Sequence, residues 1–252
     1  MSVAEALALA AEHFPRGAEE LAARLGVEVR YSPLCGCDGW SLPGAPRPII
    51  RINSKTARSR QRFTLAHELG HLVLGVPSVV GQSSADALRC GDPEERRVDD
   101  FAAQLLIPTE VVQGAVAGPP IDTAALRRLA RRARVSQLAV ALRVADLAPL
   151  LGLQQAAVLF FEQDALSWQW SPAARIDEDT ACEMLASARR SAPRTGEKKS
   201  VAFRSAKGLS FRGAKGDNPK GDHHAQTVVS LIENPWFGSA TLLVQRFTVS
   251  PP

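Results

Sequence analysis

The sequence predicts an α+β fold, in which a mainly helical N-terminal part precedes a C-terminal part that mixes strands with helix. Over residues 1–151, most apolar side chains recur every three or four positions, which is the period of an amphipathic helix. From residue 156 onward, short runs favour β-strands instead. The apolar fraction of 45% and the charged fraction of 22% are ordinary for globular proteins, so a disordered chain is excluded.

The first 106 residues are predicted to contain four helices and two strands. Residues 3–25 have helical spacing that Pro15 and Gly17 interrupt, which indicates two short helices. The elements expected after them are strands at 27–31 and 49–53 with a loop at 32–47 between them, and helices at 62–74 and 94–106.

The rest of the chain begins with a strongly helical stretch at residues 122–151 that contains one turn. A hairpin is expected next, because two apolar runs flank the dipeptide Gln163-Asp164. The elements in order are hairpin strands at 157–161 and 166–170, a helix at 176–190, a Gly- and Lys-rich segment at 208–221, and strands at 225–232 and 240–247.

Charge and cysteine content exclude several classes of protein. The formal net charge of +4 permits an acidic partner but does not establish one. Four cysteines in 252 residues are too few for a disulfide scaffold, which favours a reducing compartment. The first residues lack the basic start of a signal peptide, and no uncharged stretch is long enough to span a bilayer. We therefore expect a cytoplasmic protein without a membrane partner.

The most informative residues are His67-Glu68-Leu69-Gly70-His71, an HExxH pattern on a predicted helix. Histidines at i and i+4 lie one turn apart on one helix face, so both imidazoles reach one ion. A catalytic zinc ion takes three protein ligands and keeps one position for water, whose proton a carboxylate such as Glu68 accepts. The pattern predicts a zinc-dependent hydrolase, although another divalent ion fits the same ligands.

The third ligand is expected on the helix at residues 94–106. A longer zinc motif with a third histidine would need Gly at 74 and His at 77, where the chain has Leu74 and Pro77. Glu95 fits as ligand, and Asp99, one turn later, fits as acceptor of a hydrogen bond from a ligand histidine. The rival candidates for these positions are Glu94, Asp92 and Asp100.

Residues 49–108 contain IIRIN before the site, RFTLA leading into HELGH, and the EERRVDDFAAQLLIP helix. Through these stretches, the chain resembles the ImmA/IrrE family of bacterial metallopeptidases. It implies a zincin-like fold with His67, His71 and Glu95 as zinc ligands and Glu68 as general base. It also implies a cytoplasmic endopeptidase that cleaves an XRE-type helix-turn-helix repressor and thereby derepresses stress-response or mobile-element genes.

This resemblance suggests three parts of the chain. They are a peptidase domain at residues 1–115, a helical segment similar to a helix-turn-helix at 116–151, and an α+β regulatory domain at 152–252. A non-enzymatic alternative remains open, in which the protein is a DNA-associated regulator and its metal site is structural. The substrate, the cleaved bond and the activating signal do not follow from the sequence.

Two basic segments are candidates for docking surfaces. Residues 126–147 resemble a helix-turn-helix with five arginines within eight positions, which suits DNA phosphates, a DNA-bound repressor, or simply a solvated helix face. The presumed recognition helix at 137–147 is too apolar to read base edges. Residues 198–224 have a charge of +5 and favour a solvated loop, with a phosphate or nucleic-acid surface as second interpretation.

Other candidates have ordinary alternatives. The strand at residues 49–53, or a neighbouring one, is a candidate edge for an extended substrate. Cys35 and Cys37 are candidates for a redox pair or a soft-metal site, and Cys90 for a thiolate on the zinc, although ordinary loop thiols are the default. The candidates for a transition-state donor are His223, His224 and Tyr31.

Overall fold

The computed structural model describes residues 1–44, 46–78, 92–116, 118–171, 175–191, 201–202, 225–234 and 239–248. The chain forms two compact units, and each is described by itself. Unit 1 comprises Met1–Val111 with Ala130–Ser136, and unit 2 comprises Val112–Leu129 with Gln137–Pro252. The α+β class is confirmed, because both units contain helices and strands. The boundaries at 115/116 and 151/152 stay a prediction.

Unit 1 begins with two short helices, α1 (Val3–Glu12) and α2 (Gly17–Arg24). Ser2 and Glu5 form a reciprocal capping box that satisfies backbone donors at the start of α1. Gly17 permits the close approach of the two helices, because a Cβ there would lie 2.5 Å from the backbone of Ala10. The break expected between two helices is therefore present.

The sheet of unit 1 has the strand order β1-β3-β2. Its strands are β1 (Glu28–Ser32), β2 (Gly39–Leu42) and β3 (Ile49–Asn53). β3 pairs with β1 in parallel and with β2 antiparallel, so it is central and not an edge. β2 lies inside the predicted loop at 32–47, because a four-residue strand that contains a glycine leaves little pattern in the sequence.

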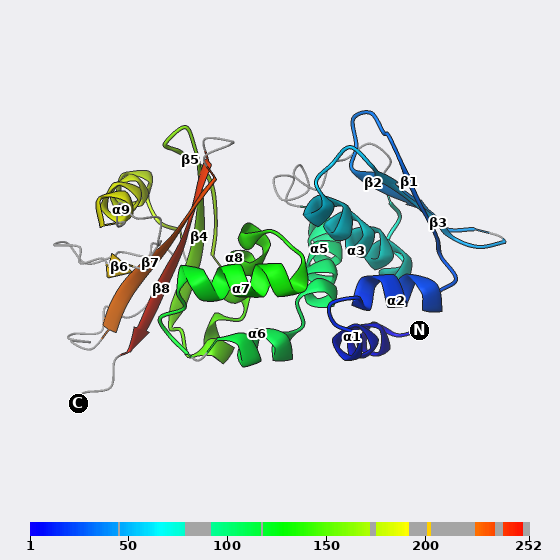
Figure 1. Ribbon diagram of the computed structural model, residues 1–252, viewed down its shortest axis with the longest axis horizontal. Coiled ribbons are helices and arrows are strands. Elements are labelled where there is room, and N and C mark those ends of the chain that lie inside the picture. The colour runs from blue at the N-terminus through cyan, green and yellow to red at the C-terminus, as the bar shows by residue number, and fades with distance from the viewer. Residues whose placement is uncertain are drawn as a thin grey trace. The chain divides into compact units, whose positions relative to one another are not determined.

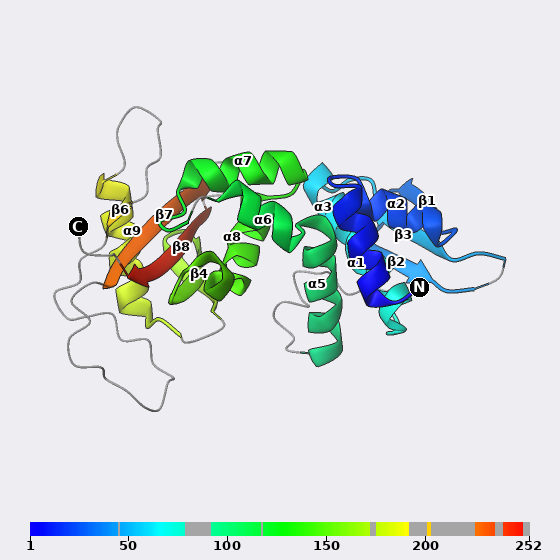
Figure 2. The ribbon, with the colours of Figure 1, turned by 90° about the horizontal axis from the view of Figure 1, so that it is seen from below.

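Two long helices, α3 (Arg58–Leu74) and α5 (Pro93–Leu106), pack against each other in unit 1, as Figures 1 and 2 show. Gly70 lies at the contact, where a Cβ would be 3.0 Å from Val98 and 3.2 Å from Phe101. α3 begins four residues earlier than predicted and ends at Gly75, which has the left-handed conformation (φ 69°) that glycine adopts without strain. The contact places the HExxH helix beside the helix of Glu95.

The chain continues from α5 through the short helix α6 (Thr109–Ala115). The elements before the next sheet are α7 (Thr123–Ala133), α8 (Gln137–Asp146) and the short η1 (Ala148–Leu151). The predicted turn is present at Arg134, whose φ is 57°. Within unit 2, α8 contacts β4 and buries Val140, Ala141 and Val144. The helix-turn-helix resemblance of this segment stays a prediction, but its second helix packs on a sheet.

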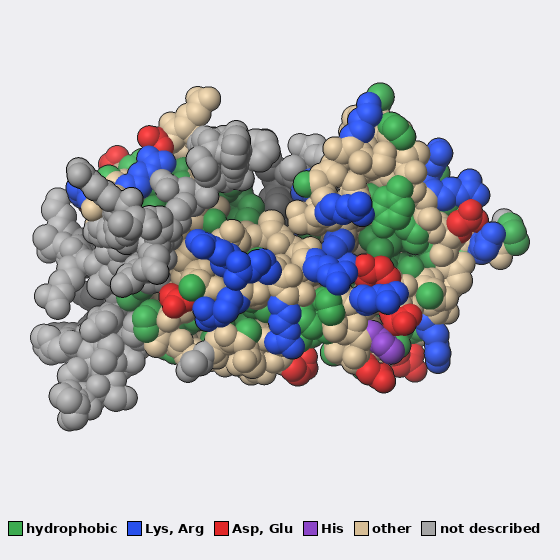
Figure 3. Space-filling model, viewed as in Figure 1, with side chains coloured by type: hydrophobic (Ala, Val, Ile, Leu, Met, Phe, Trp, Pro, Cys, Tyr) green, Lys and Arg blue, Asp and Glu red, His purple; other side chains and the backbone are tan. Residues whose placement is uncertain are grey.

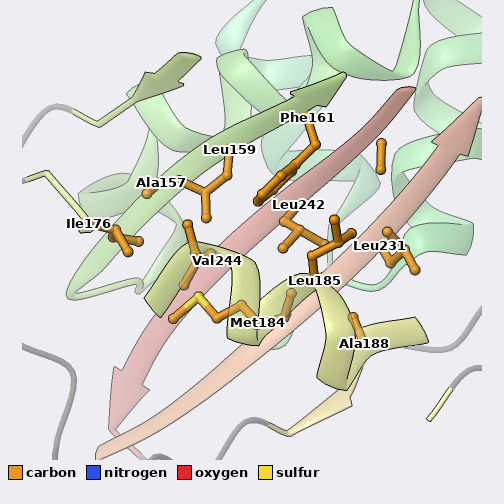
Figure 4. Close-up of a cluster of buried hydrophobic side chains, with 13 residues drawn as sticks. Ala157, Leu159, Phe161, Ile176, Met184, Leu185, Ala188, Leu231, Leu242 and Val244 are labelled. Atoms are coloured by element: carbon orange, nitrogen blue, oxygen red, sulfur yellow. The ribbon is translucent and has the colours of Figure 1, made fainter. Parts of the chain in front are cut away.

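The described residues of unit 2 form a sheet of five strands in the order β5-β4-β8-β7-β6, with antiparallel neighbours throughout. Gln163 and Asp164 both have positive φ, as in a two-residue hairpin turn between β4 and β5. Helix α9 packs on this sheet through Met184, Leu185 and Ala188 (Figure 4). The bounds are β4 (Gln155–Glu162), β5 (Ala165–Trp170), α9 (Glu178–Ser191), β6 (Val201–Ala202), β7 (Ala225–Asn234) and β8 (Ser239–Thr248).

A buried amide joins the start of the α7 segment to β8 within unit 2. The side chain of Gln245 is fully buried, accepts a hydrogen bond from Ile121 N at 2.8 Å and donates one to Ile121 O at 2.8 Å. Ser230 Oγ donates to the same carbonyl at 2.9 Å. Both backbone groups of Ile121 are thereby satisfied away from water, where an unpaired group would cost about 1–3 kcal/mol.

None of the helices in the ranges given above combines the length and the apolar character needed to cross a membrane.

Candidate metal centre

Three side chains from two helices converge in unit 1. His67 and His71 lie on α3 and Glu95 on the first turn of α5, and one ligand atom of each lies within 4.8 Å of the others. All three are buried, with exposed fractions of 3–7%. Within the described ranges, this is the one group of three His, Cys, Asp or Glu side chains that meets this spacing. The α3–α5 contact at Gly70 therefore brings the motif and the downstream glutamate together.

The second nitrogen of each histidine has an acceptor of its own. His67 Nδ1 lies 2.9 Å from Asp99 Oδ1, and His71 Nδ1 lies 3.1 Å from the carbonyl oxygen of Val76. A carbonyl oxygen and a carboxylate only accept hydrogen bonds, so both Nδ1 atoms donate. In the neutral rings, both Nε2 atoms then have a lone pair directed into the site.

These lone pairs face one another at short distances. The two Nε2 atoms are 3.1 Å apart, and Glu95 Oε2 lies 3.4 Å from that of His67 and 3.8 Å from that of His71. Acceptors placed together in a buried site repel unless a cation lies between them. Two imidazole nitrogens and one carboxylate are a ligand set that suits zinc and leaves a position for water. The donor chemistry of the site therefore fits a divalent metal ion.

The electrostatic surroundings favour positive charge at this position. Burial lowers the pKa of His67, but the hydrogen bond and the charge of Asp99, together with the charges of Glu68 and Glu95, outweigh burial and raise the pKa above its ordinary value. The carboxylates that stabilise a proton on this imidazole also stabilise a bound cation. The pKa of His67 thus indicates the same preference as the ligand geometry.

Glu68 lies beside the ligand set and is itself 4% exposed. Ser78 Oγ donates a hydrogen bond to Glu68 Oε2 at 3.0 Å. The contacts of Val76 and Ser78 were missed by sequence reasoning, because a carbonyl and a hydroxyl just after a helix have no recognisable spacing. Both residues orient side chains of the HExxH motif, one through His71 and the other through Glu68.

The rival carboxylates do not lie in the cluster. Asp92 is the N-cap of α5 and accepts a hydrogen bond from Glu94 N at 2.8 Å. Glu94 and Asp100 are exposed, whereas Asp99 is partly buried against His67. Of the candidates on α5, the structure brings Glu95 and Asp99 to the histidines.

The remaining candidates are placed elsewhere or lie outside the described residues. Cys35 and Cys37 are free thiols on a turn that the Asn53 amide binds through the Leu34 and Cys37 carbonyls. Burial, with the charges of Asp38 and Glu68, raises the pKa of Cys37, which disfavours the reactive thiolate. Tyr31 is 55% exposed on β1. The candidates Cys90, His223 and His224 and most of the segment 198–224 fall outside the described residues.

The N-terminal region is similar to known proteins. Residues 22–145 match a family model described as the IrrE N-terminal-like domain of M78 peptidases. A protein named Radiation response metalloprotease IrrE is 35% identical over 115 residues in Deinococcus radiodurans and 34% identical over 116 residues in Deinococcus deserti. Each alignment covers 44% of this chain, but only 34% and 40% of the two relatives.

A likeness in fold extends over both units. A solved structure described as a Mycobacterium tuberculosis transcriptional regulator matches with a TM-score of 0.55 and 12% identity, and covers 98% of this chain and 75% of that one. At this identity, the likeness concerns the fold alone.

Proposed function

We propose, from the premise that the chain belongs to the ImmA/IrrE family through residues 22–145, that it is a zinc-dependent endopeptidase. One observation supports this most directly: the imidazoles of His67 and His71, each fixed through Nδ1, direct their lone pairs toward Glu95. When bound there, zinc polarises a carbonyl and acidifies its water. His67, His71 and Glu95 would hold the ion, and Asp99 would orient His67.

Glu68 is suited to the proton transfer. Its carboxylate is buried beside the ligands, and Ser78 donates its hydrogen bond to Oε2. No described residue donates to Oε1, which we infer accepts the proton from water. The same carboxyl group then delivers that proton to the leaving amine. Ser78 is a positioning residue in this scheme, because it acts through Glu68.

The substrate edge that we infer is β2 and not β3. Of the two alternatives predicted from the sequence, an edge at β3 was wrong, because β3 is flanked by both other strands, whereas an edge at a neighbouring strand stays a prediction. Asn53 N donates a hydrogen bond to Asp38 O, so these two residues form a hydrogen-bonded pair of the antiparallel ladder. Such pairs alternate with non-hydrogen-bonded pairs, so the N–H and C=O groups of Gly39 and Ser41 point away from β3. No described strand pairs with this outer edge of β2, although Gly39 and Ser41 are buried overall and Trp40 is half-buried. We infer that an extended peptide binds along this edge by β-augmentation.

Proline at Ser41 should raise KM by about tenfold with little change in zinc content, because it removes one outward N–H worth about 1–1.5 kcal/mol. Ser41→Ala is the matched control, since it keeps the N–H, and its KM should stay within about twofold of wild type. Steady-state kinetics on the repressor substrate would measure both. Equal KM values for the two variants would show that β2 does not bind substrate.

The substrate that we propose is an XRE-type helix-turn-helix repressor, whose cleavage would derepress stress-response or mobile-element genes. The support is the family membership and the name of the Deinococcus relatives, which links those proteins to a radiation response. The direct test incubates the zinc-loaded protein with a small helix-turn-helix protein encoded beside its gene. Specific cleavage that chelation abolishes is expected, and a repressor that stays intact at equimolar protein would contradict this substrate.

A further inference from the structure

Helix α7 and its end expose an arginine surface. Five arginines occur within eight positions, and four of them are exposed and one half-buried. Figure 3 shows Lys and Arg side chains gathered over α7. The opposite side of the helix packs into the protein through Leu126, Leu129 and Ala133, which are at most 1% exposed. We name the five residues the arginine surface: Arg127, Arg128, Arg131, Arg132 and Arg134.

The charges of these five arginines are not balanced by acidic side chains of the described residues. Within the described part of the chain, no Asp or Glu forms an ion pair with any of the five. Arg127 and Arg131, like Arg128 and Arg132, are four positions apart on the helix, where like charges repel. Among the described residues, Arg132 is the one of the five that lies over an aromatic ring, with its guanidinium 5.3 Å from the centre of the Phe14 ring. The repulsion is relieved when a polyanion binds.

The composition of the surface favours nucleic acid over protein. Protein interfaces use arginine too, but they combine it with aromatic or other large apolar side chains at the centre. Among the described residues, the exposed large apolar side chains are Met1, Val3, Tyr31, Leu42 and Leu150, and none lies on α7. A surface of arginines without such anchors is complementary to the phosphate backbone of DNA. Each guanidinium group can donate two parallel hydrogen bonds to the oxygens of one phosphate.

The structure also limits what this surface recognises in DNA. In a helix-turn-helix protein, the second helix reads bases in the major groove. Here the second helix, α8, buries Val140, Ala141, Val144 and Ala145, so this face is not available to base edges. We propose that the arginine surface of α7 binds the phosphate backbone of duplex DNA without sequence preference.

Salt dependence of DNA binding tests the proposal. Anisotropy of a labelled duplex should give a log–log slope of roughly −4.5 if all five arginines contact phosphates, a loss of about 500-fold between 50 and 200 mM salt. Replacing Arg128 and Arg131 with Gln should weaken binding and make the slope shallower by about 2. Replacing both with Lys keeps the charge and should restore most of the affinity.

A control variant that loses the same number of positive charges elsewhere distinguishes binding by the arginine surface from an effect of net charge. Arg24→Gln with Lys55→Gln removes two exposed cations elsewhere, and should leave the slope unchanged. An equal loss in the control, or an unchanged slope in the Arg128 and Arg131 variant, would overturn the proposal. If a polyglutamate peptide competed as well as unlabelled DNA, the surface would be assigned to an acidic protein. If the affinity for one duplex sequence exceeded that for others by more than about 10³-fold, binding to the backbone alone would be contradicted.

These binding measurements need no catalytic activity. Peptidase activity without DNA binding would refute this inference alone, and DNA binding by an inactive protein would refute the proposed function alone.

Discussion

Glu68→Gln should retain zinc and lower kcat/KM for the proposed repressor substrate by roughly 10²–10⁴-fold, which is the range that a general base contributes. An amide is nearly isosteric with the carboxylate and still accepts the hydrogen bond from Ser78, but it takes no proton from water. Zinc content by elemental analysis and single-turnover cleavage are the two measurements. The expected pattern is loss of activity without loss of metal.

Glu110→Gln is a suitable control for this variant, because Glu110 is exposed on α6 and the substitution is chemically the same. Its activity should match that of wild type. If Glu68→Gln cleaved the repressor at the normal rate, another group would be the base. If both the wild type and Glu68→Gln bound zinc and were inactive on every peptide tested, the metal site would be structural, as the DNA-associated alternative requires.

Glu95→Ala should lower zinc affinity by more than about 100-fold, because it removes a ligand. Loss of a residue that only forms a hydrogen bond with a ligand already lowers metal affinity by about 10–100-fold. The substitution leaves two imidazoles, each still oriented through Nδ1 by Asp99 or Val76. Asp99→Ala should fall in that intermediate range. Competition with a chromophoric chelator measures the affinities directly, without any substrate.

Glu94→Ala is the matched control, since the neighbouring glutamate is exposed on the same helix turn. Its zinc affinity should equal that of wild type. Metal loss in Glu94→Ala combined with full binding in Glu95→Ala would reverse the assignment of the ligand. Far-UV circular dichroism of each variant distinguishes loss of a ligand from loss of the helix.

Part of the site was predictable because it depends on local geometry. His67 and His71 share a helix face through the spacing of the chain alone. Spacing in the sequence could not decide which of Asp92, Glu94 and Glu95 is the third ligand. All three lie at the start of the same helix, and packing determines which side of that helix faces the histidines. The close contact of Gly70 with Val98 and Phe101 sets this side, and no local pattern reports it.

The sheet and the helical pair show where the sequence is insufficient. β3 has an alternation visible in the sequence, but its central position depends on β2, a strand of only four residues. The residues of α8 were correctly predicted to be helical and apolar. Their partner, β4, follows in the chain, and its pairing with α8 is a tertiary contact that periodicity does not encode.

The buried amide of Gln245 has a consequence for synthesis on the ribosome. Its partner, Ile121, leaves the ribosome long before residue 245 is translated. Until then, two main-chain groups of Ile121 have only solvent or a chaperone to meet. The N-terminal metal-binding unit is largely complete earlier, so the nascent polypeptide passes through a stage with one finished half and one unfinished half.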